Sequence, residues 1–190
     1  MFLDALVMDD LAVCMEYPTP DTAKRAISAS KRVGDALEIS QALVDLAEML
    51  DSAEVGEPEA RYTMLFDLKA VCTLNLGHHL YGDTYQRGAL LSELAGELNR
   101  AGVEHEHDLP DFLPTLLRLL GRLDDDEDRR LLFYALIEPS LKAVNIALAE
   151  SPGPWPQILS LLPALLTRHI PKGSEEIAVP KRQLEVLQNA

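Results

Sequence analysis

The sequence has few basic residues and few aromatic residues. Seventeen Lys and Arg stand against 31 Asp and Glu, which gives a formal net charge of −14, and aromatics make up 5% of the chain. Such a negative field repels the phosphate backbone of nucleic acids and anionic membrane surfaces. A basic peptide or protein surface would be attracted and steered instead. We therefore expect no nucleic acid partner and no stable membrane association, and a core built mainly from Leu and Ala.

The sequence also lacks the marks of an exported or membrane-spanning protein. The two cysteines, Cys14 and Cys72, are far apart and form no CxxC pair, so no disulfide framework is indicated. The start of the chain, MFLDALVMDD, has no basic region before its apolar residues, unlike a secretory signal. The longest apolar region, 158–166, is shorter than the roughly 18 residues of a membrane span. We expect a cytoplasmic protein.

Catalytic motifs are scarce as well. There is no GxGxxG and no GxxxxGK[ST] phosphate loop. His105 and His107 alternate with acids in a polar stretch, and His78 and His79 are adjacent. A metal-dependent helical enzyme using these four histidines is one alternative hypothesis, and a generic helical adaptor is another. The residues themselves favour a solvated loop and a packed helix end, so we expect no enzyme activity, no metal and no cofactor.

What the chain does contain is apolar residues at helical spacing, interrupted by Gly and Pro. The pattern of Ile39, Leu43, Leu46 and Leu50, spaced 4, 3 and 4, is the clearest. We predict an all-α, single-domain bundle of about eight helices over residues 1–170, followed by a polar C-terminal tail over 171–190 that is flexible or locally helical. The predicted helices cover 2–15, 21–32, 35–51, 59–80, 84–100, a segment that opens at 109–111 and runs to 120, 124–148 with a bend near Pro139, and 155–168.

An ordered series of short motifs runs through the middle of the chain. Its members are Tyr62, Leu65-Phe66-Asp67, Leu74, His79, Gly82-Asp83, Arg87-Gly88, Leu94, Ala101-Gly102, Leu109-Pro110-Asp111 and Leu113-Pro114. In this order the series resembles the NarJ-type molybdenum cofactor assembly chaperones of respiratory nitrate reductase, a branch of the helical TorD-like group. The opening around Tyr17-Pro18-Thr19-Pro20 is also similar. The chain departs from the family where Leu117-Arg118-Leu119-Leu120 replaces a glutamate-rich stretch.

The resemblance implies a TorD/NarJ-like all-helical fold without enzymatic activity. It implies binding to the apo catalytic subunit of a molybdopterin oxidoreductase, through the N-terminal segment of that subunit. It further implies help with molybdenum cofactor insertion and a delay of export or membrane attachment. The substrate of the client enzyme stays open between nitrate, chlorate, selenate, dimethyl sulfide and a hydrocarbon. Two oligomeric states also stay open, a monomer and a helix-swapped dimer.

A helix lying in a groove is the physical form that such recognition would take, with the apolar face of a basic segment inward. We predict that six residues line or brace this groove: Tyr62, Phe66, Asp67, His79, Asp83 and Arg87. Arg87 would fix a turn through Asp83. A purely structural role is the alternative for each, and it weighs as much as binding for Asp67 and Asp83. Four further motif residues are predicted to serve backbone geometry or structure: Gly82, Gly88, Pro110 and Asp111.

Overall fold

The computed structural model describes residues 3–68, 72–105 and 107–173. These residues form helices and no strand, which confirms the predicted all-α bundle. The described residues contain nine helices when segments that run into one another without a break are counted as one helix. About eight were expected. The elements are α1 (Ala5–Cys14), α2 (Thr22–Arg32), α3 (Leu37–Ser52), α4 (Glu57–Tyr62), the π-helical η1 (Thr63–Asp67), α5 (Leu76–Tyr81), α6 (Tyr85–Ala101), α7 (Leu113–Leu120), α8 (Asp126–Leu131), the π-helical η3 (Leu132–Ile137), α9 (Glu138–Ala147) and α10 (Pro154–His169).

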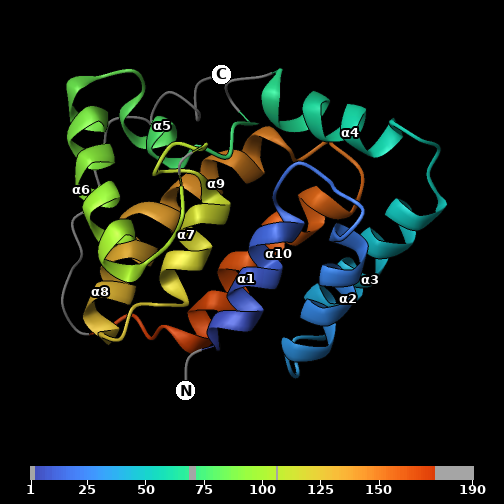
Figure 1. The fold of residues 1–190 in the computed structure, drawn as a ribbon, viewed down its shortest axis with the longest axis horizontal. Coiled ribbons are helices and arrows are strands. Elements are labelled where there is room, and N and C mark those ends of the chain that lie inside the picture. The colour runs from blue at the N-terminus through green and yellow to red at the C-terminus, as the bar shows by residue number, and fades with distance from the viewer. Residues whose placement is uncertain (1–2, 69–71, 106, 174–190) are drawn as a thin grey trace.

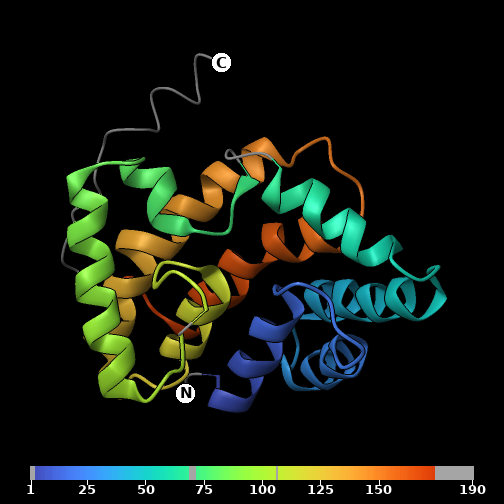
Figure 2. The same ribbon diagram turned by 45° about the horizontal axis from the view of Figure 1, so that its top comes forward.

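The helices pack in an elongated bundle (Figures 1 and 2). Helix α6 lies at one end of the molecule, and α2 with α3 at the other. Between them, α1 packs against α2 and α7, and α10 packs against α3 and α9. None of the helices that the structure describes is both long and apolar enough to span a bilayer. Most of the predicted tail, from residue 174 onward, lies outside the described residues.

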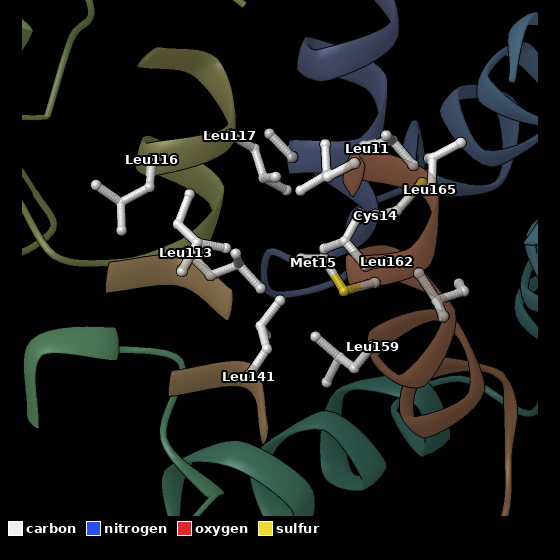
Figure 3. Close-up of a cluster of buried hydrophobic side chains, with 14 of the residues drawn as sticks. Leu11, Cys14, Met15, Leu113, Leu116, Leu117, Leu141, Leu159, Leu162 and Leu165 are labelled. Carbon is white, nitrogen blue, oxygen red and sulfur yellow. The ribbon is translucent and has the colours of Figure 1, made fainter. Parts of the chain in front are cut away.

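The core is aliphatic, as the scarcity of aromatics predicts. Leucines of α1, α7, α9 and α10 converge in the middle of the molecule (Figure 3). Those labelled there include Leu11, Leu113, Leu141 and Leu162, each at most 1% exposed. Burying a leucine contributes about 1.5–3 kcal/mol, so this cluster is the main source of the bundle's cohesion.

One predicted helix is wrong. The sequence pattern predicts a single helix over 59–80, but α4 and η1 end at Asp67, and α5 begins only at Leu76. Asn75 has extended backbone angles and forms an isolated antiparallel bridge with Phe112. Backbone hydrogen bonds between residues 74–76 and residues 111–113 take the place of the hydrogen bonds that a continuous helix would form. For the same reason α7 starts at Leu113 and not at 109–111.

The predicted helix over 124–148 is present but not uniform. Its acidic start is confirmed, since the Asp125 side chain accepts a hydrogen bond from the Glu127 amide at 2.6 Å. The turns of η3 are π-helical and lead directly into α9, whose second residue is Pro139. Proline lacks an amide hydrogen and interrupts regular α-helical bonding. The π-helical segment therefore ends two residues before Pro139, close to the bend that the sequence predicts.

The C-terminal end of α1 is capped by two aromatic side chains. The last carbonyls of a helix have no partner within the helix. Here the Tyr62 hydroxyl donates to the Met15 carbonyl at 2.8 Å, and the Trp155 indole Nε1 donates to the Cys14 carbonyl at 2.9 Å. Both side chains are buried. They tie α1 to the α4–η1 helix and to the start of α10.

Replacing Tyr62 with Phe should lower the free energy of unfolding by about 1–3 kcal/mol, because a buried carbonyl loses its donor. Urea unfolding followed by Trp155 fluorescence measures this directly, since the Trp155 ring contacts Tyr62. The matched control is Tyr17→Phe, which removes a hydroxyl from a residue that is 51% exposed. Equal losses in the two variants would contradict the cap.

Candidate functional site

An aromatic cluster reaches from the core to the surface beside the end of α1. The Tyr62 ring lies edge-on to three other rings, with centroid distances of 5.7 Å to Tyr17, 4.8 Å to Phe66 and 5.6 Å to Trp155. Trp155 is fully buried, whereas Tyr17 is half exposed. Such pairs contribute about 0.5–1.5 kcal/mol beyond the burial of their area. The cluster forms a rigid apolar floor.

Residues 73–76, here called the strap, form another wall of the same hollow, to which they contribute Thr73, Leu74 and Asn75. The strap is held by backbone bonds to the loop before α7. The Leu76 amide donates to the Asp111 carbonyl at 2.8 Å, and the Leu113 amide donates to the Leu74 carbonyl at 2.8 Å. These bonds fix the strap against a segment more than thirty residues further along the chain.

Two side chains hold the strap from its other side. His79 Nε2 donates to the Thr73 carbonyl at 2.7 Å, because a carbonyl oxygen can only accept. Ser140 Oγ of α9 donates to the Leu76 carbonyl at 2.9 Å. His79 is buried, and this burial lowers the pKa of its imidazole, although the hydrogen bond to Thr73 acts in the opposite direction. The neutral ring is the form that the fold prefers.

A buried ion pair anchors the turn that faces the strap. The Asp111 carboxylate is fully buried and accepts two hydrogen bonds from Arg87 of α6, at 2.9 Å from Nε and 3.3 Å from Nη2. Asp83, which is largely exposed, lies 3.4 Å from Arg87 Nη1. A Cβ at Gly77 would lie 2.6 Å from Asp111 Oδ2, so α5 has no room for a side chain there. Asp111 is thus locked between α5 and α6.

The turn before Asp111 is closed by its own hydrogen bond. The Phe112 amide donates to the Leu109 carbonyl at 3.0 Å, which puts Pro110 at the second position of a β-turn. Gly82 ends α5 with a φ of 61°, a conformation that glycine adopts at little cost. Nothing in the structure requires glycine at position 88, where a Cβ would meet no atom within 4 Å.

Floor, strap and turn enclose a hollow of about 470 Å³, here called the aromatic hollow. Its lining combines aromatic rings with three carboxylates. Burial raises the pKa of the Tyr62 hydroxyl, and the carboxylates of Asp67, Glu16 and Asp108 add to this rise. The lining residues are Glu16, Tyr17, Tyr62, Phe66, Asp67, Thr73, Leu74, Asn75, His107, Asp108, Leu109 and Phe112.

The negative charge of the hollow is concentrated at its outer edge. Glu16 is paired with Arg118 of α7, with Oε1 and Nη1 2.5 Å apart. Asp67 and Asp108 are exposed and have no ion-pair partner within the described ranges. The hollow thus combines an apolar aromatic surface with two exposed carboxylates. This arrangement is complementary to a peptide segment in which an apolar side chain is flanked by basic ones.

The structure divides the six predicted groove residues into two groups. Tyr62, Phe66 and Asp67 line the aromatic hollow. His79 lies behind the strap and bonds to it, while Asp83 and Arg87 belong to the ion-pair cluster around Asp111. Two further lining residues, Tyr17 and Asp108, are not among the six that the sequence predicts, and the main partner of Arg87 is Asp111 rather than the predicted Asp83. No spacing in the sequence indicates these contacts, because each joins segments that are distant along the chain.

The four histidines of the alternative enzyme hypothesis do not form one site. His78 Nδ1 lies 3.4 Å from Asp83 Oδ1, whereas His105 Nδ1 is 3.2 Å from the Val103 carbonyl. Among the residues that the structure describes, no three His, Cys, Asp or Glu side chains are grouped so that they could hold a metal ion. No observation therefore favours the metal-dependent enzyme.

Replacing Arg87 with Met should lower the free energy of unfolding by about 3–5 kcal/mol, because it leaves the Asp111 carboxylate buried and unpaired. The double variant R87M/D111L should recover much of this loss. Arg61→Met is the matched control, since its pair with Glu57 is exposed and contributes at most about 1 kcal/mol. Urea unfolding measures all three, and a loss in R87M no larger than in R61M would refute the anchoring role.

Stability should fall as the pH drops below about 6.5, the ordinary pKa of histidine. The folded state holds His79 at a lower pKa, so the unfolded chain binds the proton first and gains stability relative to the folded one. His79→Gln keeps a donor for the Thr73 carbonyl without titrating. Its unfolding free energy should therefore change less between pH 7.5 and 5.5 than that of the parent chain. An exposed-histidine control, His107→Gln, should keep the parent's slope, and parallel slopes in all three would contradict this account.

Comparison with known proteins gives relatives of one kind. The probable nitrate reductase molybdenum cofactor assembly chaperone NarW of Escherichia coli K12 is 27% identical over 114 residues, which cover 60% of this chain and 48% of NarW. The nitrate reductase molybdenum cofactor assembly chaperone NarJ of the same strain is 31% identical over 103 residues, 54% of this chain and 43% of NarJ. NarJ of Escherichia coli O157:H7 matches to the same extent. No protein-family model matches the chain.

The matched region thus spans less than half the length of each relative. It nevertheless covers more than half of this chain. The chain is therefore similar in sequence to the NarJ-type nitrate reductase molybdenum cofactor assembly chaperones, which confirms the resemblance seen in its motif series.

Proposed function

We propose that this chain is an assembly chaperone for the catalytic subunit of a molybdenum oxidoreductase, either nitrate reductase or a related enzyme of the DMSO reductase family. It binds the apo subunit in the cytoplasm, assists molybdenum cofactor insertion and delays export or membrane attachment. The similarity to NarJ and NarW carries this proposal, since both are named as nitrate reductase molybdenum cofactor assembly chaperones.

The aromatic hollow supports the proposal with a surface that suits a protein segment. An amphipathic helix would insert an apolar side chain between Tyr17, Phe66 and Phe112. Basic side chains on either side of it would meet the carboxylates of Asp67 and Asp108. Because the chain carries a net charge of −14, a basic segment would also be drawn toward it from a distance. The N-terminal segment of the client's catalytic subunit is the proposed occupant.

The other predicted residues act on the shape of this surface and do not line it. His79 holds the strap, and Arg87 with Asp83 holds the turn at Asp111. These contacts hold the walls of the hollow in place, so that binding costs little ordering of the chaperone. In this proposal the chain catalyses no reaction. It binds the apo subunit and delays its export or membrane attachment.

Co-expression with a candidate catalytic subunit tests the function. The molybdenum content of the purified subunit should rise when this chain is present. Charge removal by Asp67→Asn with Asp108→Asn should weaken binding of the apo subunit about two- to thirty-fold at low salt, since exposed charge pairs contribute about 0.2–1 kcal/mol each. Isothermal titration with the N-terminal peptide of the subunit measures this loss.

The control for these variants is Asp35→Asn with Asp51→Asn, which removes the same charge from two exposed positions, one just before α3 and one in its last turn. This control should leave affinity nearly unchanged. Molybdenum content that does not depend on the chain would overturn the chaperone function. Equal weakening by both double variants would instead overturn the assignment of binding to the aromatic hollow.

A further inference from the structure

A second hollow lies at the α6 end of the molecule, between α6 and the helix formed by α8 and η3. It measures about 290 Å³, and eight of its eleven lining residues are Leu or Ala. We call it the leucine hollow. It shares no residue with the aromatic hollow, and the proposed chaperone function makes no use of it. Its lining comprises Leu90, Glu93, Leu94, Glu97, Leu119, Leu123, Asp128, Leu131, Leu132, Ala135 and Leu136.

The helices on both sides of the leucine hollow leave apolar side chains partly uncovered. Helix α6 packs against α5 and α7, but of its 17 residues only Leu94 and Leu98 are buried. Leu90 of α6 and Leu132 of the facing helix are only partly buried. Leu131, next to Leu132, is 56% exposed. Apolar surface that is gathered at one place in this way indicates an interaction site, whereas single exposed leucines do not.

A π-helical segment forms part of this lining, as it does in the aromatic hollow. The segment η3 contributes Leu132, Ala135 and Leu136 to the leucine hollow. The segment η1 contributes Phe66 and Asp67 to the aromatic hollow. Turns of π-helix are rare in proteins and occur frequently at functional sites. The shared feature therefore supports a binding role for the leucine hollow.

The dimensions of the leucine hollow suit apolar side chains that project from a helix. Along α6 its lining runs from Leu90 to Glu97, a rise of about 10 Å or two helical turns. Pockets for small molecules usually measure about 300–1,000 Å³ and contain a few polar groups that orient the ligand. Here the polar lining residues are Glu93, Glu97 and Asp128, and none of them is buried. The apolar face of a helix therefore fits this hollow better than a polar small molecule does.

The acidic rim of the leucine hollow selects the charge of the occupant. Glu93 and Asp128 are exposed, and neither has an ion-pair partner in the part of the chain that the structure describes. Glu97 is paired with Arg100 of the same helix. Two copies of this chain that met through the hollow would bring these carboxylates together, and each copy carries a net charge of −14. The charge therefore favours a different and basic protein over a second copy.

We propose that the leucine hollow is a second docking site, which binds a basic amphipathic helix of another protein. Apolar side chains one turn apart insert between α6 and the α8–η3 helix, and flanking lysines or arginines pair with Glu93 and Asp128. Binding covers Leu131 and gives α6 a further packing partner. Because the two hollows share no residue, a partner can dock here while the aromatic hollow is occupied. The proposal does not rest on the chaperone function.

Methyl NMR of the full-length chain tests the proposal with a synthetic peptide. The peptide is an amphipathic helix of about four turns, with leucines on one face and lysines on both flanks of that face. At low salt it should shift the methyl resonances of Leu90 and Leu131 in a saturable way, and it should leave those of Leu43 in α3 unchanged. A second peptide, in which glutamate replaces every lysine, should bind the leucine hollow several-fold more weakly. In the same spectra, Leu74 and Leu109 report separately on the aromatic hollow.

Two variants of exposed residues locate the binding. Glu93→Gln with Asp128→Asn should weaken binding of the lysine peptide at the leucine hollow about two- to thirty-fold, the range expected when two exposed charge pairs are lost. The matched control, Asp67→Asn with Asp108→Asn, removes the same charge from the aromatic hollow and should leave the affinity of the leucine hollow unchanged. Leu131→Asn removes apolar contact without adding charge, and it should weaken binding several-fold.

Three outcomes would overturn the proposal. Shifts confined to Leu74 and Leu109 would place the peptide in the aromatic hollow alone. Equal affinity of the lysine and glutamate peptides for the leucine hollow would remove the selection by charge. Shifts at Leu90 and Leu131 that depend on protein concentration without any peptide, together with a dimer mass in analytical ultracentrifugation, would assign the hollow to a second copy of the chain.

Discussion

The buried carboxylate of Asp111 is the constraint on which the candidate site depends. Its side chain is held by Arg87 of α6, and its carbonyl accepts the amide at the start of α5. One residue thereby joins two helices and the turn that precedes α7. A buried charge without its partner would cost several kcal/mol, so the three elements keep their arrangement as long as the pair stays closed.

The shape of the aromatic hollow follows from this arrangement. The strap is held in place because its carbonyls and amides bond to the turn at Asp111, to His79 and to Ser140. The floor is fixed by Tyr62, which caps α1 and packs on Trp155. Both walls are thus held by buried hydrogen bonds, while the acids at the mouth are left to solvent. In the proposed complex, the apolar walls provide most of the affinity for the partner segment. The exposed carboxylates increase the rate of association and the selectivity for basic segments.

Most of the fold could be predicted from the sequence, because leucine spacing and Gly or Pro breaks are local signals. The helices over 35–51 and 84–100 are examples that differ from α3 and α6 by a residue or two at each end. The helix over 59–80 could not be predicted correctly, since its interruption is caused by bonds to residues 111–113. The same limit applies to the site. Tyr62, Phe66 and Asp67 belong to the motif series and follow one another along one helix, whereas Tyr17 and Asp108 approach them only through folding.

We propose that the aromatic hollow holds a segment of an immature partner. Hydrogen–deuterium exchange of the chain, with and without the apo catalytic subunit of a nitrate reductase, tests it most directly. Binding should slow exchange in the α4–η1 helix, the strap and the turn at 109–112, and should change it little in α2 and α3. Protection confined to α2 and α3, or no protection at a subunit concentration that saturates binding, would contradict it.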